Sequence, residues 1–151
     1  MIDILSSSIE SIKAIYHPQI INISRKFNLS EGNRFFTANE ALGIVRALIS
    51  IYQNCLSHGN INSQTLITVE IVNNNEVAIH NGISDHTKGY IIKNNYIDKV
   101  KNFSPDSDYN KLISEGGTGL YKIYRYLVDS SASFDFDIQL NGNIFSQKVM
   151  L

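Results

Sequence analysis

A glycine-rich turn in the last third of the chain carries the clearest sign of chemistry. It reads Glu115-Gly116-Gly117-Thr118-Gly119-Leu120 and leads into a segment with helical spacing. Glycines let a backbone approach a phosphate closely, and a helix start offers free N–H groups at the positive end of its dipole. The turn therefore predicts an anion site, although a flexible loop before a helix explains the same residues equally well. A P-loop would need a following lysine, and a Rossmann fingerprint would need a strand leading directly into the turn.

A row of polar side chains is the second group with chemical potential. Arg46, Ser50, Asn54 and His58 are spaced four residues apart, so they share one face of a predicted helix. The amide oxygen of Asn54 is a suitable hard ligand for Mg²⁺. A solvent-facing helix surface is the alternative explanation for this row.

The helix that carries the row is the best-defined element in the sequence. Thr37 and Glu40 form a capping box at its start, and Gly59 is placed to end it. Its apolar stripe is predicted to contain Ala41, Val45, Leu48, Tyr52 and Cys55, widened by Leu42, Ile49 and Leu56.

Two β-hairpins follow from alternating apolar residues. The first joins 67–71 to 77–80 through three asparagines, and the second joins 134–138 to 144–151 through Asn141-Gly142, a type I′ turn signal. An amphipathic helix is predicted over 4–16 and a strand over 20–27. Residues 83–115 look like a loop with a short helix at 96–103, which is typical of a functional lid.

This order of elements predicts an α+β fold, a two-layer α/β sandwich. Its mixed, largely antiparallel sheet would be covered on one face by helices. The 151 residues suffice for one domain, in which 1–37 form an N-terminal extension and 83–115 the lid-like segment.

Composition narrows the classes of partner and location. The net charge of −1 gives no general attraction to nucleic acid or to anionic lipid, and no apolar run approaches the length that spans a membrane. The single cysteine, Cys55, excludes an internal disulfide. We therefore expect a cytoplasmic protein that binds neither nucleic acid nor membrane.

Three short motifs together resemble the GHKL ATPase superfamily, which includes histidine kinases, anti-sigma-factor serine kinases, type II topoisomerases and the mismatch-repair and heat-shock ATPases. Residues 53–59 (QNCLSHG) resemble its N box, 77–82 (VAIHNG) its first glycine box and 116–121 (GGTGLY) its second. The resemblance covers 38–151. The aromatic Tyr121, with Leu127-Val128-Asp129 further on, is closest to the anti-sigma serine kinases.

The resemblance implies the Bergerat fold and an ATP site that uses Mg²⁺. Asn54 would hold the Mg²⁺ between the ATP phosphates, and His58 would lie near the phosphates or the lid. Gly82 would let the chain turn beside adenine. The second glycine box would offer backbone N–H groups to the phosphates, through Gly116, Gly117, Thr118 and Gly119, with Leu120 completing it.

Three residues depart from the family pattern. His80 stands where the family has an aspartate that accepts a hydrogen bond from the adenine amino group, and a neutral imidazole accepts only one such bond. Ser84 replaces a later glycine of the same box. Ser50 occupies the usual general-base position, where its hydroxyl has no basicity near neutral pH.

The sequence therefore predicts a histidine-kinase-like ATP-binding domain in signalling or transcriptional regulation. It would bind Mg-ATP with weak or absent phosphotransfer, and an ATP-dependent protein kinase of histidine or anti-sigma serine type stays open. The alternatives are a degenerate, non-catalytic domain that acts as a protein-binding or phosphotransfer partner, and an interaction module without nucleotide history. The expected protein partner is a response regulator or an anti-sigma-type target, and the helix over 4–16 could pair two copies.

Overall fold

The computed structural model describes residues 8, 10, 11, 14, 21–25, 36–60, 67–73, 76–102, 118–130 and 134–150. The helix predicted over 4–16 lies largely outside this part, although Ser8, Glu10, Ser11 and Ala14 are helical. The described elements are β1 (Ile21–Arg25), α2 (Ala38–His58), β2 (Ile67–Asn73), β3 (Glu76–Gly82), α3 (Asp85–Lys93), α4 (Tyr96–Lys101), α6 (Thr118–Asp129), β4 (Asp135–Asn141) and β5 (Ile144–Met150).

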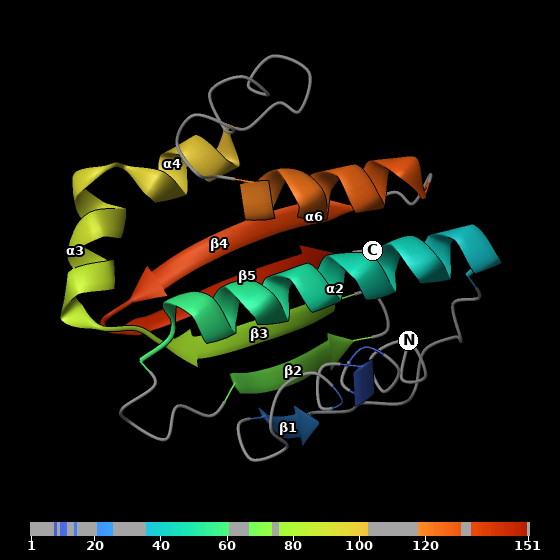
Figure 1. The fold of residues 1–151 in the computed structure, drawn as a ribbon, viewed down its shortest axis with the longest axis horizontal. Coiled ribbons are helices and arrows are strands. Elements are labelled where there is room, and N and C mark those ends of the chain that lie inside the picture. Colours follow the sequence, from blue (N-terminus) through green and yellow to red (C-terminus); the bar gives the residue numbers. More distant parts are fainter. Residues whose placement is uncertain are drawn as a thin grey trace.

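The strands form one five-stranded sheet in the order β1-β2-β3-β5-β4. β1 runs parallel to β2, and all other neighbours are antiparallel. Helices α2 and α6 lie side by side over one face of this sheet, while α3 and α4 follow one another at its end (Figure 1). The predicted α+β sandwich with a mixed, largely antiparallel sheet is therefore confirmed.

Helix α2 begins at the predicted capping box. The Thr37 N–H donates to Glu40 Oε2 at 2.8 Å, and the Glu40 N–H donates to Thr37 Oγ1 at 3.3 Å. The helix also ends where predicted, but Gly59 has φ −70, which is extended backbone and not a left-handed cap. A side chain is excluded at Gly59 because a Cβ there would lie 2.5 Å from the Cys55 carbonyl oxygen.

The buried face of α2 differs from the predicted stripe. Leu48, Tyr52 and Cys55 are buried as predicted, whereas Leu42 is 47% exposed. Nearly every turn of α2 carries extra apolar residues, so its periodicity alone does not select one face. The sheet and α6 select it, and the buried set also includes Gly43, Ile44, Ala47 and Ile51.

Helices α2 and α6 approach each other closely at Gly43. A Cβ on Gly43 would lie 2.3 Å from Ser130 Cβ and 2.6 Å from the Tyr126 carbonyl oxygen. The hydroxyl of Ser130 is itself engaged, because it donates to the Leu127 carbonyl at 2.6 Å. Glycine is thus required at this crossing for space.

Two local predictions were wrong. Residues 85–93 form helix α3, capped by Ser84, where a loop was predicted; α4 confirms the short helix predicted at 96–103. In the final hairpin the two-residue loop is Gly142-Asn143, and only Gly142 has a positive φ, of 61. Glycine at the first central position fits a type II′ turn, not the predicted type I′ turn.

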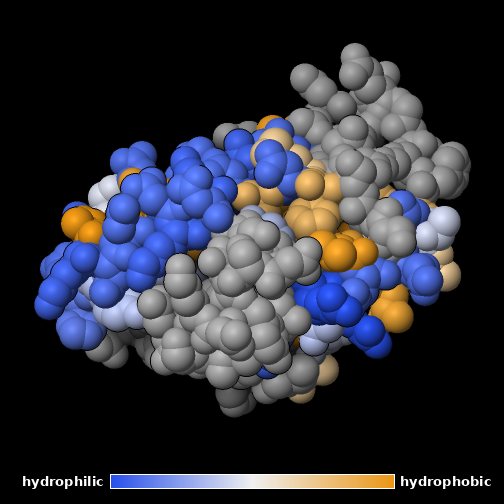
Figure 2. All heavy atoms as spheres, turned by 90° about the horizontal axis from the view of Figure 1, so that it is seen from above, coloured by the Kyte–Doolittle hydropathy of each residue, from blue (hydrophilic) through white to orange (hydrophobic). Residues whose placement is uncertain are grey.

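The described surface is mainly hydrophilic on the face drawn in Figure 2, and hydrophobic residues gather there only in small patches. Large apolar side chains that are exposed include Leu42, Val72, Tyr90, Ile92, Val128 and Ile144. Among the described residues, no helix combines the length and apolar character needed to cross a membrane.

The two helix glycines Gly43 and Gly89 provide a matched test of the α2–α6 crossing. A Cβ on Gly89 meets nothing within 4 Å, so Gly89→Ala should raise the free energy of unfolding by about 0.5–1 kcal/mol through helix propensity. Gly43→Ala gains the same helix propensity but overpacks the contact between α2 and α6. It should therefore lower the free energy of unfolding by about 1–3 kcal/mol. Urea unfolding followed by circular dichroism measures both. Equal changes in the free energy of unfolding of the two variants would contradict the close approach of α2 and α6 at Gly43.

Candidate functional site

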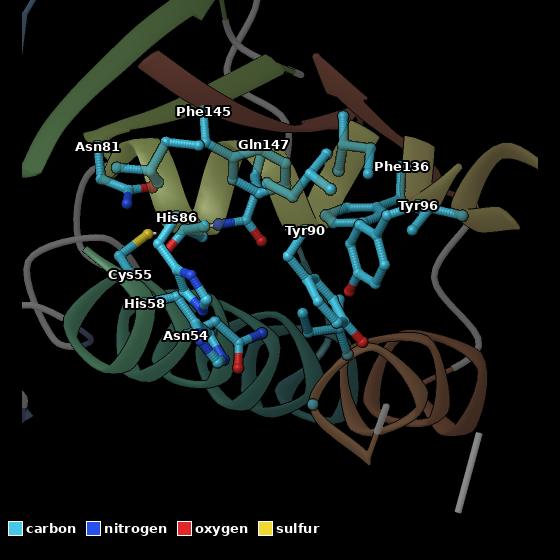
Figure 3. Close-up of a pocket in the computed structure, with 17 residues that line it drawn as sticks. Asn54, Cys55, His58, Asn81, His86, Tyr90, Tyr96, Phe136, Phe145 and Gln147 are labelled. Carbon is cyan, nitrogen blue, oxygen red and sulfur yellow. Dashed lines mark hydrogen bonds between the residues drawn. The ribbon is translucent and has the colours of Figure 1, made fainter. Parts of the chain in front are cut away.

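A cavity of about 350 Å³ lies between α2, the inner face of the sheet, α3, α4 and the start of α6. Its walls are largely apolar, and a small number of polar side chains point into it (Figure 3). The lining residues are Asn54, Cys55, His58, Asn81, Ile83, His86, Thr87, Tyr90, Ile91, Tyr96, Val100, Gly119, Ile123, Phe136, Ile138, Phe145 and Gln147. An apolar cleft with a few convergent polar groups is typical of a small-molecule site.

Asn54 and Gly119 meet at one end of this cavity. A Cβ on Gly119 would lie 2.6 Å from Asn54 Oδ1 and 3.0 Å from Asn54 Nδ2. The side-chain amide on α2 therefore lies directly against the first turn of α6, where any side chain larger than hydrogen would displace it. The predicted convergence of Asn54 with the glycine turn is confirmed for Gly119.

The rest of the second glycine box is only partly described. Thr118 and Leu120 belong to the first turn of α6, while Gly116 and Gly117 lie outside the described residues. A helix N-terminus beside an amide oxygen combines N–H donors with a hard oxygen ligand.

Two histidines line the cavity at the same end. His58 comes from the last turn of α2, and His86 comes from the first turn of α3. Figure 3 shows both imidazoles on the side of the cavity where Asn54 lies. The sequence singled out His58 through the N box but offered no comparable pattern for His86.

The remaining members of the polar row do not line the cavity. Ser50 is buried on α2, and its hydroxyl donates to the Arg46 carbonyl at 3.1 Å. The Arg46 guanidinium lies over the ring of Tyr126 on α6, 5.9 Å from its centroid. The row thus changes role along α2, from packing on α6 to lining the cavity.

The structure corrects the position assigned to His80. Val77 and Ile79 point to the helices, so alternation along β3 directs His80 to the opposite face of the sheet. There its Nδ1 lies 2.8 Å from Ser146 Oγ and its Nε2 lies 3.4 Å from Glu70 Oε2.

Asn81, the next residue along β3, lines the cavity in place of His80. It is 3% exposed, and its Nδ2 donates to the Gly82 carbonyl at 3.3 Å. Its Oδ1 is buried and has no hydrogen-bond partner among the described residues. Such an acceptor is costly to leave unpaired, which marks it as a place for a ligand donor. The period-two pattern through Val77 and Ile79 was the signal that could have identified Asn81 from the sequence.

Gly82 and Ser84 position α3. The Gly82 carbonyl also accepts from the Asn60 N–H at 3.1 Å, which ties the end of β3 to the residues after α2. Ser84 Oγ accepts from the Thr87 N–H at 3.1 Å as the N-cap of α3. A serine in place of the family's glycine therefore starts a helix here.

The turn between β4 and β5 fastens the same helix. Asn143 Nδ2 donates to Asp85 Oδ1 at 2.7 Å, and Lys88 Nζ donates to Asn143 Oδ1 at 3.1 Å. The Ile83 N–H donates to the Asn143 carbonyl at 2.8 Å. These bonds hold α3 so that one side of it lines the cavity.

A buried thiol and a buried amide lie together against the cavity. Gln147 Nε2 on β5 donates to Cys55 Sγ on α2 at 3.3 Å. Burial raises the pKa of the Cys55 thiol to about 12, so it is uncharged at neutral pH. Among the described residues, no group of three or more histidine, cysteine, aspartate or glutamate side chains could hold a metal ion.

Comparison with known proteins identifies the fold. No family model matches the chain, and neither does any curated protein. The cytoplasmic segment of histidine kinase QseC matches with a TM-score of 0.56 at 12% identity, over 98% of this chain and 72% of that one. The blue-light-activated histidine kinase EL346 of Erythrobacter litoralis matches with a TM-score of 0.56 at 10% identity, over 96% of this chain and 39% of that one.

These matches confirm the resemblance at the level of the fold. The chain has the fold of these histidine kinase structures. Residues 53–59, which resemble the N box, span the end of α2, and Thr118 and Gly119 of the segment that resembles the second glycine box begin α6. At 12% and 10% identity the likeness establishes the fold alone.

Cys55 is the only cysteine, so its alkylation reports directly on the cavity. With a pKa of about 12, the thiolate fraction at pH 8 is about one in ten thousand. We expect iodoacetamide to label the native chain at least about 100-fold more slowly than the urea-unfolded chain. Mass spectrometry over time measures both rates. Labelling at the same rate in both states would show that Cys55 is neither buried nor held protonated.

Proposed function

We propose that the chain is a histidine-kinase-like ATP-binding domain that holds Mg-ATP with weak or absent phosphotransfer. One observation carries the proposal: the Asn54 amide lies against Gly119 at one end of a cavity whose wall also presents an unpaired buried acceptor, Asn81 Oδ1. A nucleotide needs one group of residues for its phosphates and another for its base, and these two parts of one cavity suit those needs.

The phosphate end would use Asn54, His58 and the backbone of α6's first turn. Asn54 Oδ1 is the oxygen available to Mg²⁺, and the N–H groups at the start of α6 are available to phosphate oxygens. Bound Mg²⁺ would neutralise phosphate charge and orient the phosphates. His86 would add a second imidazole at this end, contributed by α3.

The base would lie against Asn81 in place of the family's aspartate. Its Oδ1 is fixed as an acceptor because the Nδ2 of the same amide donates to Gly82. An adenine amino group can supply the missing donor. A neutral amide accepts a weaker hydrogen bond than a carboxylate, so binding should be weaker than with an aspartate there.

The position of Ser50 supports weak or absent phosphotransfer. A serine has no basicity near neutral pH, and here its proton is already donated to the Arg46 carbonyl. It also lies outside the residues that line the cavity. A general base would have to come from elsewhere, and among the described residues no carboxylate contacts His58 or His86 to orient its imidazole.

The biological setting stays a prediction from sequence. A response regulator or an anti-sigma-type target is the protein partner that such a domain would serve, in the cytoplasm and in signalling or transcription. Pairing of two copies through the helix predicted over 4–16 is part of the same proposal. The degenerate, non-catalytic alternative differs in one measurable respect, since it binds no Mg-ATP.

Titration calorimetry with Mg-ATP at millimolar concentration tests the phosphate end. Gly119→Val would push the Asn54 amide away from α6, so we expect binding to become undetectable. Gly89→Val is the matched control, because its side chain enters open space and its affinity should equal that of the parent. No heat beyond dilution in the parent chain would favour the degenerate alternative.

Substitutions on β3 test which residue faces the base. Asn81→Asp restores a charged acceptor and should tighten Mg-ATP binding by about 5-fold or more, whereas Asn81→Leu should weaken it by about 10-fold. His80→Gln, on the opposite face, should leave the affinity unchanged. A change in Mg-ATP affinity in His80→Gln but not in the Asn81 variants would show that His80, and not Asn81, contacts the base.

Incubation with γ-labelled ATP tests phosphotransfer. We expect no stable label on the parent chain over hours, and Ser50→Glu should not create any, because residue 50 does not line the cavity. Acid-stable and acid-labile label are counted separately, so that serine and histidine phosphorylation are both detected. Label on the parent chain would establish an active kinase.

A further inference from the structure

Gln147 is an unusual residue for its place in the fold. It lies on β5, between β3 and β4, and its side chain is on the face that packs against the helices. Its neighbours on that face, Val149 and Phe145, are apolar, yet Gln147 is only 4% exposed. A long amide is rarely buried in this way unless its polar atoms have partners.

The Cys55 thiol supplies one of those partners. Gln147 Nε2 donates to Cys55 Sγ at 3.3 Å. Among the described residues, this is the hydrogen bond that the Gln147 amide nitrogen makes. An amide whose nitrogen points toward the sulfur must turn its oxygen the other way. Figure 3 shows this arrangement, with the Gln147 nitrogen toward Cys55 and its oxygen toward the open part of the cavity.

On the neighbouring strand β3, the Asn81 amide is oriented like that of Gln147, with its nitrogen bonded to the protein. Asn81 pairs with Phe145 in the β3–β5 register, so Gln147 is its diagonal neighbour on the same face. Such neighbours lie about 7–8 Å apart at Cα, which long side chains can span. In both amides the nitrogen is engaged within the protein, by Gly82 for Asn81 and by Cys55 for Gln147. The two amide oxygens therefore remain as hydrogen-bond acceptors on one wall of the cavity.

We propose that Gln147, oriented by the Cys55 thiol, is a specificity-determining residue that works with Asn81 to select a purine with a 6-amino group over one with a 6-oxo group. This inference rests on the proposed nucleotide function. An exocyclic amino group has two hydrogens, and two carbonyl oxygens can accept one each. A 6-oxo group would instead bring its lone pairs against two fixed acceptors and leave them unpaired.

Cys55 acts in this scheme as a positioning residue. An alanine at 55 would free the Gln147 amide to turn over and present its nitrogen to the cavity. A serine at 55 keeps an acceptor for the Gln147 nitrogen and should preserve the orientation. The two substitutions differ little in volume, so packing alone would not separate their effects on base selection.

The experiment is titration calorimetry of the full chain with Mg-ATP and Mg-ITP, which differ at the 6-position of the base. We expect the parent to bind ATP at least about 10-fold more tightly than ITP. Gln147→Met keeps the side-chain length without an acceptor, and should bring this ratio to within about 3-fold of one. Cys55→Ala should lower the ratio in the same direction, and Cys55→Ser should retain it.

Gln139→Met is the matched control, because it makes the same change on β4 at a residue that faces away from the helices. It should leave both affinities unchanged. An unaltered ratio in Gln147→Met or in Cys55→Ala would overturn the inference while leaving nucleotide binding intact. If Gln147→Met fails to fold by circular dichroism, the contrast between Cys55→Ala and Cys55→Ser decides. Absence of binding in the parent would instead overturn the proposed function, and this inference with it.

Discussion

The close approach of α2 to α6 is the constraint on which the rest of the molecule depends. It is made at two places: a glycine is required at the first, and at the second a glycine leaves room for the Asn54 side chain. Gly43 on α2 lies against Ser130 and the Tyr126 carbonyl at the end of α6, and Gly119 at the start of α6 lies against Asn54 late in α2. Two side-by-side helices held at both ends fix one wall of the cavity, since only their spacing brings the Asn54 amide to the first turn of α6.

The polar groups at one end of the cavity differ in kind from those on the wall that the sheet forms. One end has an amide oxygen, two imidazoles and a helix N-terminus, whereas the sheet wall presents amide oxygens whose nitrogens are already engaged. The first set suits an anion with a metal ion, and the second suits a ligand that donates hydrogen bonds. The proposed nucleotide would satisfy both, with its phosphates at one end and its amino-substituted base at the other.

The departures from the family pattern take on physical meaning once the side chains are placed. His80 is part of a polar contact with Glu70 and Ser146 on the outer face of the sheet. Ser84 begins α3, and Ser50 bonds back to its own helix. None of these residues lines the cavity, so none contributes a lost contact there. At the wall proposed to bind the base, the Asn81 amide takes the place that the resemblance assigns to a carboxylate, and it retains an acceptor oxygen but carries no charge.

The sequence by itself determined the elements whose signals are local. Capping residues, helical spacing and strand alternation are set by neighbours along the chain, and they predicted α2, the two hairpins and α6. The tertiary structure alone decided which face each element presents. The apolar excess of α2 left its buried stripe ambiguous until the sheet and α6 covered it, and α3 depends on Asn143 from a distant turn. The pairing of Gln147 with Cys55 likewise follows from strand register and helix packing. Such contacts join residues far apart in the chain, and no local pattern encodes them.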